Sequence, residues 1–146
     1  MNARIFADTN VLIAGADSRS GASHAVLMMA EIGLIQLVVS HQVLNEAERN
    51  IRKKLPRALS NFAEQMAYLN LEVHADPSWE EAARWESVIE PKDAPILAVA
   101  VAEKVNRILS LNTKDFTQNV AAACGIPIQT PAHFVQNIRT IIDLGI

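Results

Sequence analysis

Short apolar runs alternate along this chain with longer stretches in which apolar residues recur every three or four positions. The periodic stretches predict helices, and the short runs between them predict strands. Strands that alternate with helices indicate an α/β fold with a largely parallel sheet covered on both faces. No linker or repeat divides the sequence, so we expect one domain over residues 1–146. The predicted strands are residues 4–7, 37–39, 71–73, 107–111 and 126–128.

Several local signals refine this pattern. Residues 15–21 contain two glycines and predict a flexible loop, after which Ser23 is expected to cap a helix. Ser78 and Glu81 form a capping-box pattern, which predicts a helix that presents Trp79, Ala82 and Ile89. Pro127 lies within the last predicted strand, which predicts an edge position because proline cannot serve a central ladder. The terminal helix is expected to carry Phe134, Ile138, Ile141 and Ile142 on one face.

The composition is that of an ordinary soluble globular protein, with 50% hydrophobic and 20% charged residues. Cys124 is the single cysteine, which excludes a disulfide framework and a thiolate metal site. The amino terminus lacks a signal-peptide pattern, and the longest apolar stretch, residues 94–102, is less than half a membrane span. We therefore expect a cytoplasmic protein without a membrane partner.

Four acidic residues occupy positions that a parallel α/β sheet would bring to one edge. Asp8 follows the first predicted strand and Asp115 follows the fourth. Asp93 opens a helix, and Glu46 lies early in another. Strand ends and helix starts meet at the same edge of such a sheet. An all-oxygen pocket there would suit Mg²⁺ or Mn²⁺.

Each acid also has a simpler explanation when it is taken alone. Asp8 and Asp93 could cap the turn or helix that follows them, and Asp115 could be a solvated loop residue. Glu46 could form a surface pair with Arg49, worth only ~0.2–0.5 kcal/mol. The metal-site interpretation depends on the four acids together. The polar residues expected to orient them or their bound water are Asn10, Glu90, Ser110, Asn112 and Thr113.

The overall charge of −3 is not typical of a nucleic-acid-binding protein, but the positive charge is locally concentrated. A basic run follows Glu46 and is either a solvated helix face or a rim that contacts phosphates. Within it, Arg49 and Lys53 are our candidates for phosphate contacts. The run comprises Arg49, Arg52, Lys53, Lys54 and Arg57, and the scattered histidines, expected to be surface or packing residues, are His24, His41, His74 and His133.

Residues 6–13, 44–46, 92–100 and 110–116 resemble the successive signatures of the PIN-domain ribonucleases, in order and in spacing. Residues 128–131 with Phe134 resemble the closing strand and helix of that family. The resemblance implies a three-layer α/β/α fold with about five strands. It also implies an endoribonuclease whose Mg²⁺ or Mn²⁺ is held by the residues that match the family's acids, Asp8, Glu46, Asp93 and Asp115. Thr113 departs from the pattern, because some members carry a further acid there.

Many bacterial members of this family are VapC-like toxins of toxin–antitoxin pairs. They are often dimeric, and an antitoxin protein blocks their cleft. The resemblance therefore implies an RNA substrate, an antitoxin partner and a homodimer. Two alternatives remain open. One is a non-catalytic PIN scaffold that binds RNA or protein. The other is a receiver-like phosphotransfer domain, although such domains usually carry a second acid beside the strand-end aspartate.

Overall fold

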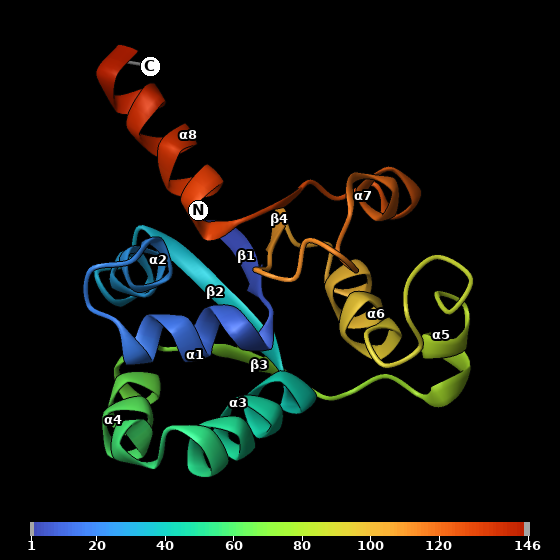
Figure 1. Ribbon diagram of the computed structural model, residues 1–146. Helices are drawn as coiled ribbons and strands as arrows, with labels where there is room; N and C mark the ends of the chain where they lie inside the picture. Colours follow the sequence, from blue (N-terminus) through green and yellow to red (C-terminus); the bar gives the residue numbers. More distant parts are fainter. Residues whose placement is uncertain (1, 145–146) are drawn as a thin grey trace.

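The sheet is the centre of the fold. The computed structural model describes residues 2–144 and contains five parallel strands in the order β3-β2-β1-β4-β5 (Figure 1). This arrangement confirms the predicted α/β fold with a parallel sheet. The strands are β1 (Ala3–Ala7), β2 (Ile35–Ser40), β3 (Glu72–His74), β4 (Arg107–Leu109) and β5 (Ile128–Gln129).

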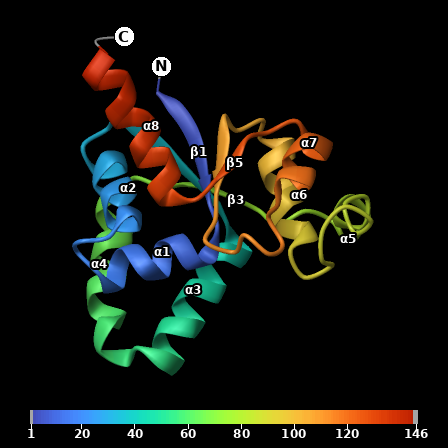
Figure 2. The ribbon, with the colours of Figure 1, turned by 45° about the horizontal axis from the view of Figure 1, so that its top comes forward.

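Helices cover both faces of this sheet, which gives the three layers that the family resemblance implied. The first four helices lie on one face, and α5, α6 and α7 lie on the other (Figures 1 and 2). The last helix, α8, packs against α2 and projects from the body. The helices are α1 (Thr9–Asp17), α2 (Ala22–Glu31), α3 (His41–Lys54), α4 (Leu59–Tyr68), α5 (Trp79–Ala83), α6 (Ala94–Ala102), α7 (Gln118–Cys124) and α8 (Pro131–Leu144), and a 3₁₀ turn covers Pro56–Ala58.

The strand order reverses direction between β1 and β4. The chain first adds β2 and β3 on one side of β1, then returns to add β4 and β5 on the other. Ile5 pairs with Leu37 of β2 on one side and with Arg107 of β4 on the other. In an open parallel sheet, the crevice beyond the strand ends at such a reversal is the usual ligand site. The topology therefore directs attention to the residues that follow β1 and β4.

One of the covering helices, α6, is buried almost all round. Ala94, Ile96, Leu97, Val99 and Ala100 all belong to the main hydrophobic core. A helix that is apolar on every side cannot lie on a surface and must pass through the interior. This fixes the position of the residue that precedes it, Asp93.

Among residues 2–144, no helix combines the length and hydrophobicity needed to cross a membrane.

Two local expectations were wrong. Residues 15–17 continue α1, so the predicted loop is shorter than expected, and Gly21 rather than Ser23 occupies the N-cap of α2. Ser78 does cap α5, because its hydroxyl accepts a hydrogen bond from the backbone of Glu81. However, α5 is a short helix that ends at Ala83 and does not reach Ile89, and Trp79 on it is 79% exposed.

The carboxyl-terminal elements agree partly with expectation. Strand β5 pairs with β4 at the edge of the sheet, as Pro127 predicted. On α8, Phe134 is buried and Ile138 packs against the core, but Ile141 and Ile142 are exposed. The apolar face of α8 therefore extends beyond the core that it covers.

We expect Gly15→Ala to lower the free energy of unfolding by about 1–3 kcal/mol. A Cβ atom at this position of α1 would lie 2.4 Å from Cδ1 and 2.9 Å from Cγ of Leu27, which is fully buried. Helix propensity alone would give the opposite sign, by up to ~1 kcal/mol. Urea denaturation measures the change. Gly21→Ala is the control, since its nearest neighbour would be Ser18 Oγ at 3.9 Å. Equal stability of the two variants would contradict this account.

Candidate functional site

Asp8 lies at the reversal point of the sheet and links its two halves. Its backbone N–H donates to the carbonyl of Leu109, at the end of β4, over 3.0 Å. Its side chain is buried at the start of α1, where one oxygen accepts a 2.8 Å hydrogen bond from the Thr9 backbone. The other oxygen accepts from Ser110 Oγ at 2.7 Å and from Asn10 Nδ2 at 3.5 Å. Asp8 is thus both a helix cap and a buried carboxylate in a fixed orientation.

The loop after β4 is held by the same residues. Ser110 Oγ also accepts from the backbone of Asn112 at 3.0 Å, and Asn10 Oδ1 accepts from the backbone of Leu111 at 3.0 Å. The Asn112 side chain in turn donates to Asp115 Oδ2 over 3.0 Å and accepts from the Asp115 backbone over 3.2 Å. These bonds bring Asp115 to the same edge as Asp8.

Asp93 precedes α6 and is buried, with 8% exposure. Its side chain makes no capping hydrogen bond, so the capping explanation for this residue was wrong. Its Oδ2 atom is buried and has no hydrogen-bond partner. A buried polar atom without a partner costs about 1–3 kcal/mol. Among the acids at this edge, Asp93 has the strongest physical need for a cation.

Glu46 faces the same edge from α3. Its carboxylate accepts hydrogen bonds from Thr9 Oγ1 at 3.1 Å and from Gln42 Nε2 at 2.9 Å. These two partners replace the surface pair with Arg49 that sequence reasoning had considered. Neither Thr9 nor Gln42 was predicted, although Gln42 stands one helical turn before Glu46 and Thr9 directly follows Asp8. We call Asp8, Glu46, Asp93 and Asp115 the four-acid cluster.

Burial and mutual repulsion raise the affinity of this cluster for protons. Burial raises the pKa of Asp8, against the lowering effect of its bonds to Ser110 and Thr9, and the Glu46 charge adds to the rise. Burial, the hydrogen bond with Asp115 and the charge of Asp8 together raise the pKa of Asp93 to about 7. The metal-free cluster therefore holds a proton near neutral pH.

Of the pair formed by Asp93 and Asp115, Asp115 carries the negative charge. The Asn112 side chain lowers the pKa of Asp115, and the hydrogen bond with Asp93 and the charges of Lys92 and Lys114 act in the same direction. Lys92 Nζ lies 4.0 Å from Asp115 Oδ2. A protonated carboxyl on the buried Asp93, beside an ionised carboxylate on the partly exposed Asp115, is the arrangement that like charges adopt when no cation is bound.

The donor set fits a hard divalent cation. The candidate ligand atoms are all carboxylate oxygens, which Mg²⁺ and Mn²⁺ prefer. The unpartnered Asp93 oxygen would gain a ligand bond, and the bonds from Ser110, Asn10 and Asn112 would orient the other carboxylates. Among residues 2–144, a second cluster includes Glu72 and His74. Its possible ligand atoms lie closer together than those of the four acids.

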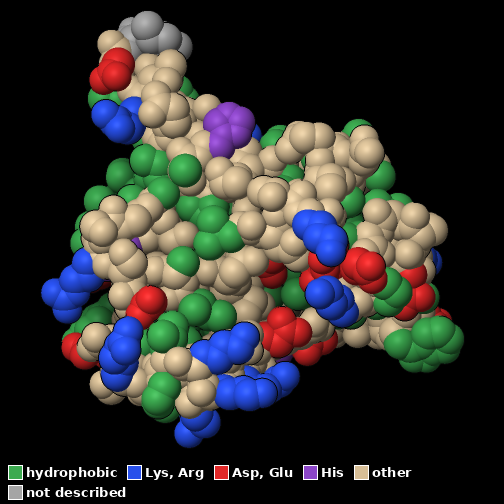
Figure 3. Space-filling view, viewed as in Figure 1, with side chains coloured by type: hydrophobic (Ala, Val, Ile, Leu, Met, Phe, Trp, Pro, Cys, Tyr) green, Lys and Arg blue, Asp and Glu red, His purple; other side chains and the backbone are tan. Residues whose placement is uncertain are grey.

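The remaining predicted residues lie around the cluster, and of these the Glu90 backbone carbonyl accepts a 2.9 Å hydrogen bond from the Asp93 N–H. Glu90 is exposed and lines a hollow of about 380 Å³ together with Asp115, and Thr113 is exposed beside a separate hollow. Arg49 and Lys53 are exposed on α3, beyond Glu46. Figure 3 shows Lys and Arg side chains gathered over α3, with acidic side chains beside them in the direction of α6. Sequence reasoning missed Lys92, whose signal was its position next to Asp93.

A parallel sheet whose reversal point collects four carboxylates defines a class of α/β protein with an acidic cluster at the ends of its strands. Residues 4–114 match the PIN domain family, and this match covers well over half of the chain. The protein therefore belongs to the PIN domain family. Asp8, Glu46 and Asp93 fall inside the matched region, and Asp115 lies one residue beyond it. No curated protein sequence matches the chain.

Solved structures share the fold. A toxin–antitoxin complex from Klebsiella pneumoniae is 25% identical, with a TM-score of 0.62, over 87% of this chain and 97% of that one. VapBC2 from Rickettsia felis, bound to a DNA fragment from its promoter, is 17% identical, with a TM-score of 0.62, over 87% and 98%. VapC20 from Mycobacterium tuberculosis, a toxin that cleaves the sarcin–ricin loop, is 19% identical, with a TM-score of 0.58, over 82% and 94%.

Without a divalent cation, we expect the free energy of unfolding to fall as pH rises from about 4 to about 7. In this window Asp93 remains protonated in the folded protein and is ionised in the unfolded chain. The folded state then binds more protons, so raising the pH destabilises it, by at most ~1.4 kcal/mol per pH unit for one proton. The lowered pKa of Asp115 acts below this window. Urea denaturation across the window measures the slope.

Asp93→Asn is the matched variant, because it removes the titrating group and keeps the shape. Its unfolding free energy should change less with pH than that of the wild type. Identical slopes for the two proteins would contradict the assignment of the proton to Asp93.

Proposed function

We propose that this protein is a Mg²⁺- or Mn²⁺-dependent endoribonuclease that hydrolyses RNA phosphodiester bonds, with residues 1–146 acting as one nuclease domain. The observation that carries the proposal is Asp93, a buried carboxylate with an unpartnered oxygen, set beside Asp8 and Asp115 at the reversal point of the sheet. Membership of the PIN domain family supports a nuclease, and it leaves the phosphotransfer alternative without support.

The chain's own residues prepare the site for its cation. Asp93 must release its proton before it can act as a ligand, so cation binding is coupled to pH. Ser110 and Asn10 hold Asp8, and Asn112 holds Asp115, each by hydrogen bonds that fix the orientation of the carboxylate. When bound there, the metal lowers the pKa of a coordinated water and offsets charge on the phosphate.

RNA must approach a strongly acidic crevice, so nearby positive charge is required. Before cation binding, carboxylates at the crevice repel the phosphate backbone. Lys92 stands at the crevice beside Asp115, and Arg49 and Lys53 extend the positive charge along α3. Arg52 is less available, because it pairs with Glu48 at 2.7 Å. We infer that Arg49 and Lys53 contact phosphates away from the scissile bond.

We further propose that the protein is the toxin of a toxin–antitoxin pair, that it forms a homodimer and that an antitoxin protein covers the four-acid cluster. The similarity to a toxin–antitoxin complex from Klebsiella pneumoniae supports the partner. The exposed Ile141 and Ile142 of α8 offer apolar surface for a second copy. Co-expression with the product of an adjacent small reading frame, followed by size-exclusion chromatography, tests both associations.

Asp8→Asn should abolish Mn²⁺-dependent cleavage of RNA by the purified protein. Loss of a metal ligand should cost at least the ~10–100-fold that is typical of an outer-shell partner. The rate of cleavage of a fluorescent single-stranded RNA measures the effect, and a chelator should stop cleavage by the wild type. Asp17→Asn, an exposed acid at the end of α1, is the control and should cleave normally. If the Asp8 variant were as active as the wild type, the four-acid cluster would not be the catalytic site.

Replacing Arg49 and Lys53 together with glutamine should weaken RNA binding and make it less dependent on salt. Each lost contact with a single strand should reduce the slope of log K against log salt by about 0.7. Fluorescence anisotropy with the Asp8→Asn background prevents cleavage during the titration. Arg19→Gln with Arg139→Gln removes the same charge from other elements and should leave the slope unchanged. Equal slopes for the two double variants would assign the phosphate contacts elsewhere.

A further inference from the structure

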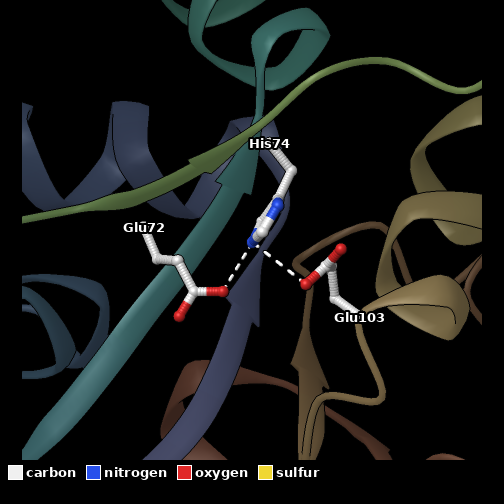
Figure 4. Close-up of side chains that lie close together, drawn as sticks. All are labelled: Glu72, His74 and Glu103. Carbon is white, nitrogen blue, oxygen red and sulfur yellow. Dashed lines mark hydrogen bonds and ion pairs between the residues drawn. The ribbon is translucent and has the colours of Figure 1, made fainter.

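We propose that Glu72, His74 and Glu103 form a second cation site, for a borderline transition metal such as Zn²⁺. The three residues converge from β3 and from the end of α6 (Figure 4). One ligand atom from each lies within 4.8 Å of the other two. This site is independent of the proposed nuclease function, because Glu103 follows α6 whereas Asp93 precedes it, about 15 Å away along the helix.

The donor set separates this cluster from the four-acid cluster. His74 Nε2 lies 2.5 Å from Glu72 Oε2 and 3.2 Å from Glu103 Oε1. Two carboxylates and one imidazole nitrogen suit Zn²⁺ or Co²⁺, whereas Mg²⁺ prefers oxygen ligands alone. A 3.2 Å separation is close to that of two ligands ~2.0–2.1 Å from one tetrahedral ion. The 2.5 Å pair must open slightly, which two partly exposed side chains allow.

Arg4 already provides one positive charge to the cluster and competes with a metal ion for its carboxylates. Its Nε donates to Glu72 Oε1 over 3.1 Å, and its Nη2 bonds to Glu72 Oε2 and, over 3.2 Å, to Glu103 Oε1. The Arg4 guanidinium, together with His74, lowers the pKa of Glu72 to about 2, so this carboxylate is ionised. The Nε bond falls on Glu72 Oε1, which would not bind the metal, whereas the Nη2 bonds fall on the two oxygens nearest His74. Arg4 Nη2 must therefore move aside when a metal ion binds.

The charge of the cluster leaves room for one more cation. Two carboxylates and one guanidinium sum to a single negative charge when the imidazole is neutral. A metal ion at His74 Nε2 can compensate this charge. A hollow of about 290 Å³ adjoins His74 and Glu103, with Asp76 and Glu81 also on its wall, and gives an ion and its water ligands a way in.

The test is a zinc titration of the full chain carrying Asp8→Asn and Asp93→Asn, which disable the four-acid cluster. We expect one bound Zn²⁺ by isothermal calorimetry. Co²⁺ should give the visible absorption of a four- or five-coordinate centre. Adding His74→Ala should weaken binding at least ~10-fold, and Glu103→Gln should also weaken it. His133→Ala, an exposed histidine on α8, should have no effect.

Arg4→Gln distinguishes a metal site from an ion-pair network. Removal of the competing charge should tighten zinc binding at a true site, provided that circular dichroism shows the variant folded. Absence of zinc binding both with and without Arg4, or an affinity unchanged by His74→Ala, would overturn the proposal and leave a network of ion pairs only. His74→Ala alone should keep normal Mn²⁺-dependent cleavage of RNA, so the outcome here does not depend on the nuclease proposal.

Discussion

The contact between the ends of β1 and β4 is the constraint on which the rest of the site depends. The Asp8 N–H bonds to the Leu109 carbonyl, and the Ser110 hydroxyl bonds to the Asp8 carboxylate. These two bonds join residues about a hundred positions apart in the sequence at the place where the strand order reverses. Because Asp8 also precedes α1, the same carboxylate caps that helix, holds the loop after β4 and contributes to the negative charge of the four-acid cluster. A substitution that moved this junction would disturb all three.

The four-acid cluster is an unfavourable arrangement of charge in the metal-free protein. Carboxylates that are buried together repel one another, and the metal-free protein relieves the repulsion by keeping a proton on Asp93 and placing the negative charge on Asp115. The hydrophobic burial of α6 is what holds Asp93 there, since the helix cannot move outward without exposing its apolar sides. The packing of an apolar helix thus offsets an unfavourable arrangement of charge that a bound cation would make favourable.

Much of this architecture could be predicted from the sequence, because strands and their alternation with helices follow from short-range patterns of apolar residues. The four acids were also located correctly at one sheet edge, since the ends of parallel strands must meet there. The partners of Glu46 and the lack of a capping bond at Asp93 could not be predicted, because they depend on side-chain directions set by tertiary packing. The close contact of Gly15 with Leu27 was missed for the same reason. In the sequence, Gly15 begins a segment whose composition predicts a flexible loop. His74 gave no signal, since its partners Glu72 and Glu103 come from different elements and Arg4 from a third.

The shortness of the two outer strands decides how another protein can attach to this one. Strand β3 has three residues and β5 has two, so each sheet edge offers very few free backbone groups. A partner chain cannot gain a useful ladder of main-chain hydrogen bonds by extending the sheet, which is a common way of binding an extended peptide. Such short edges also protect the protein from edge-to-edge aggregation. Any protein that associates with this fold must therefore recognise side chains on its helices and loops, where specificity is carried by shape and charge.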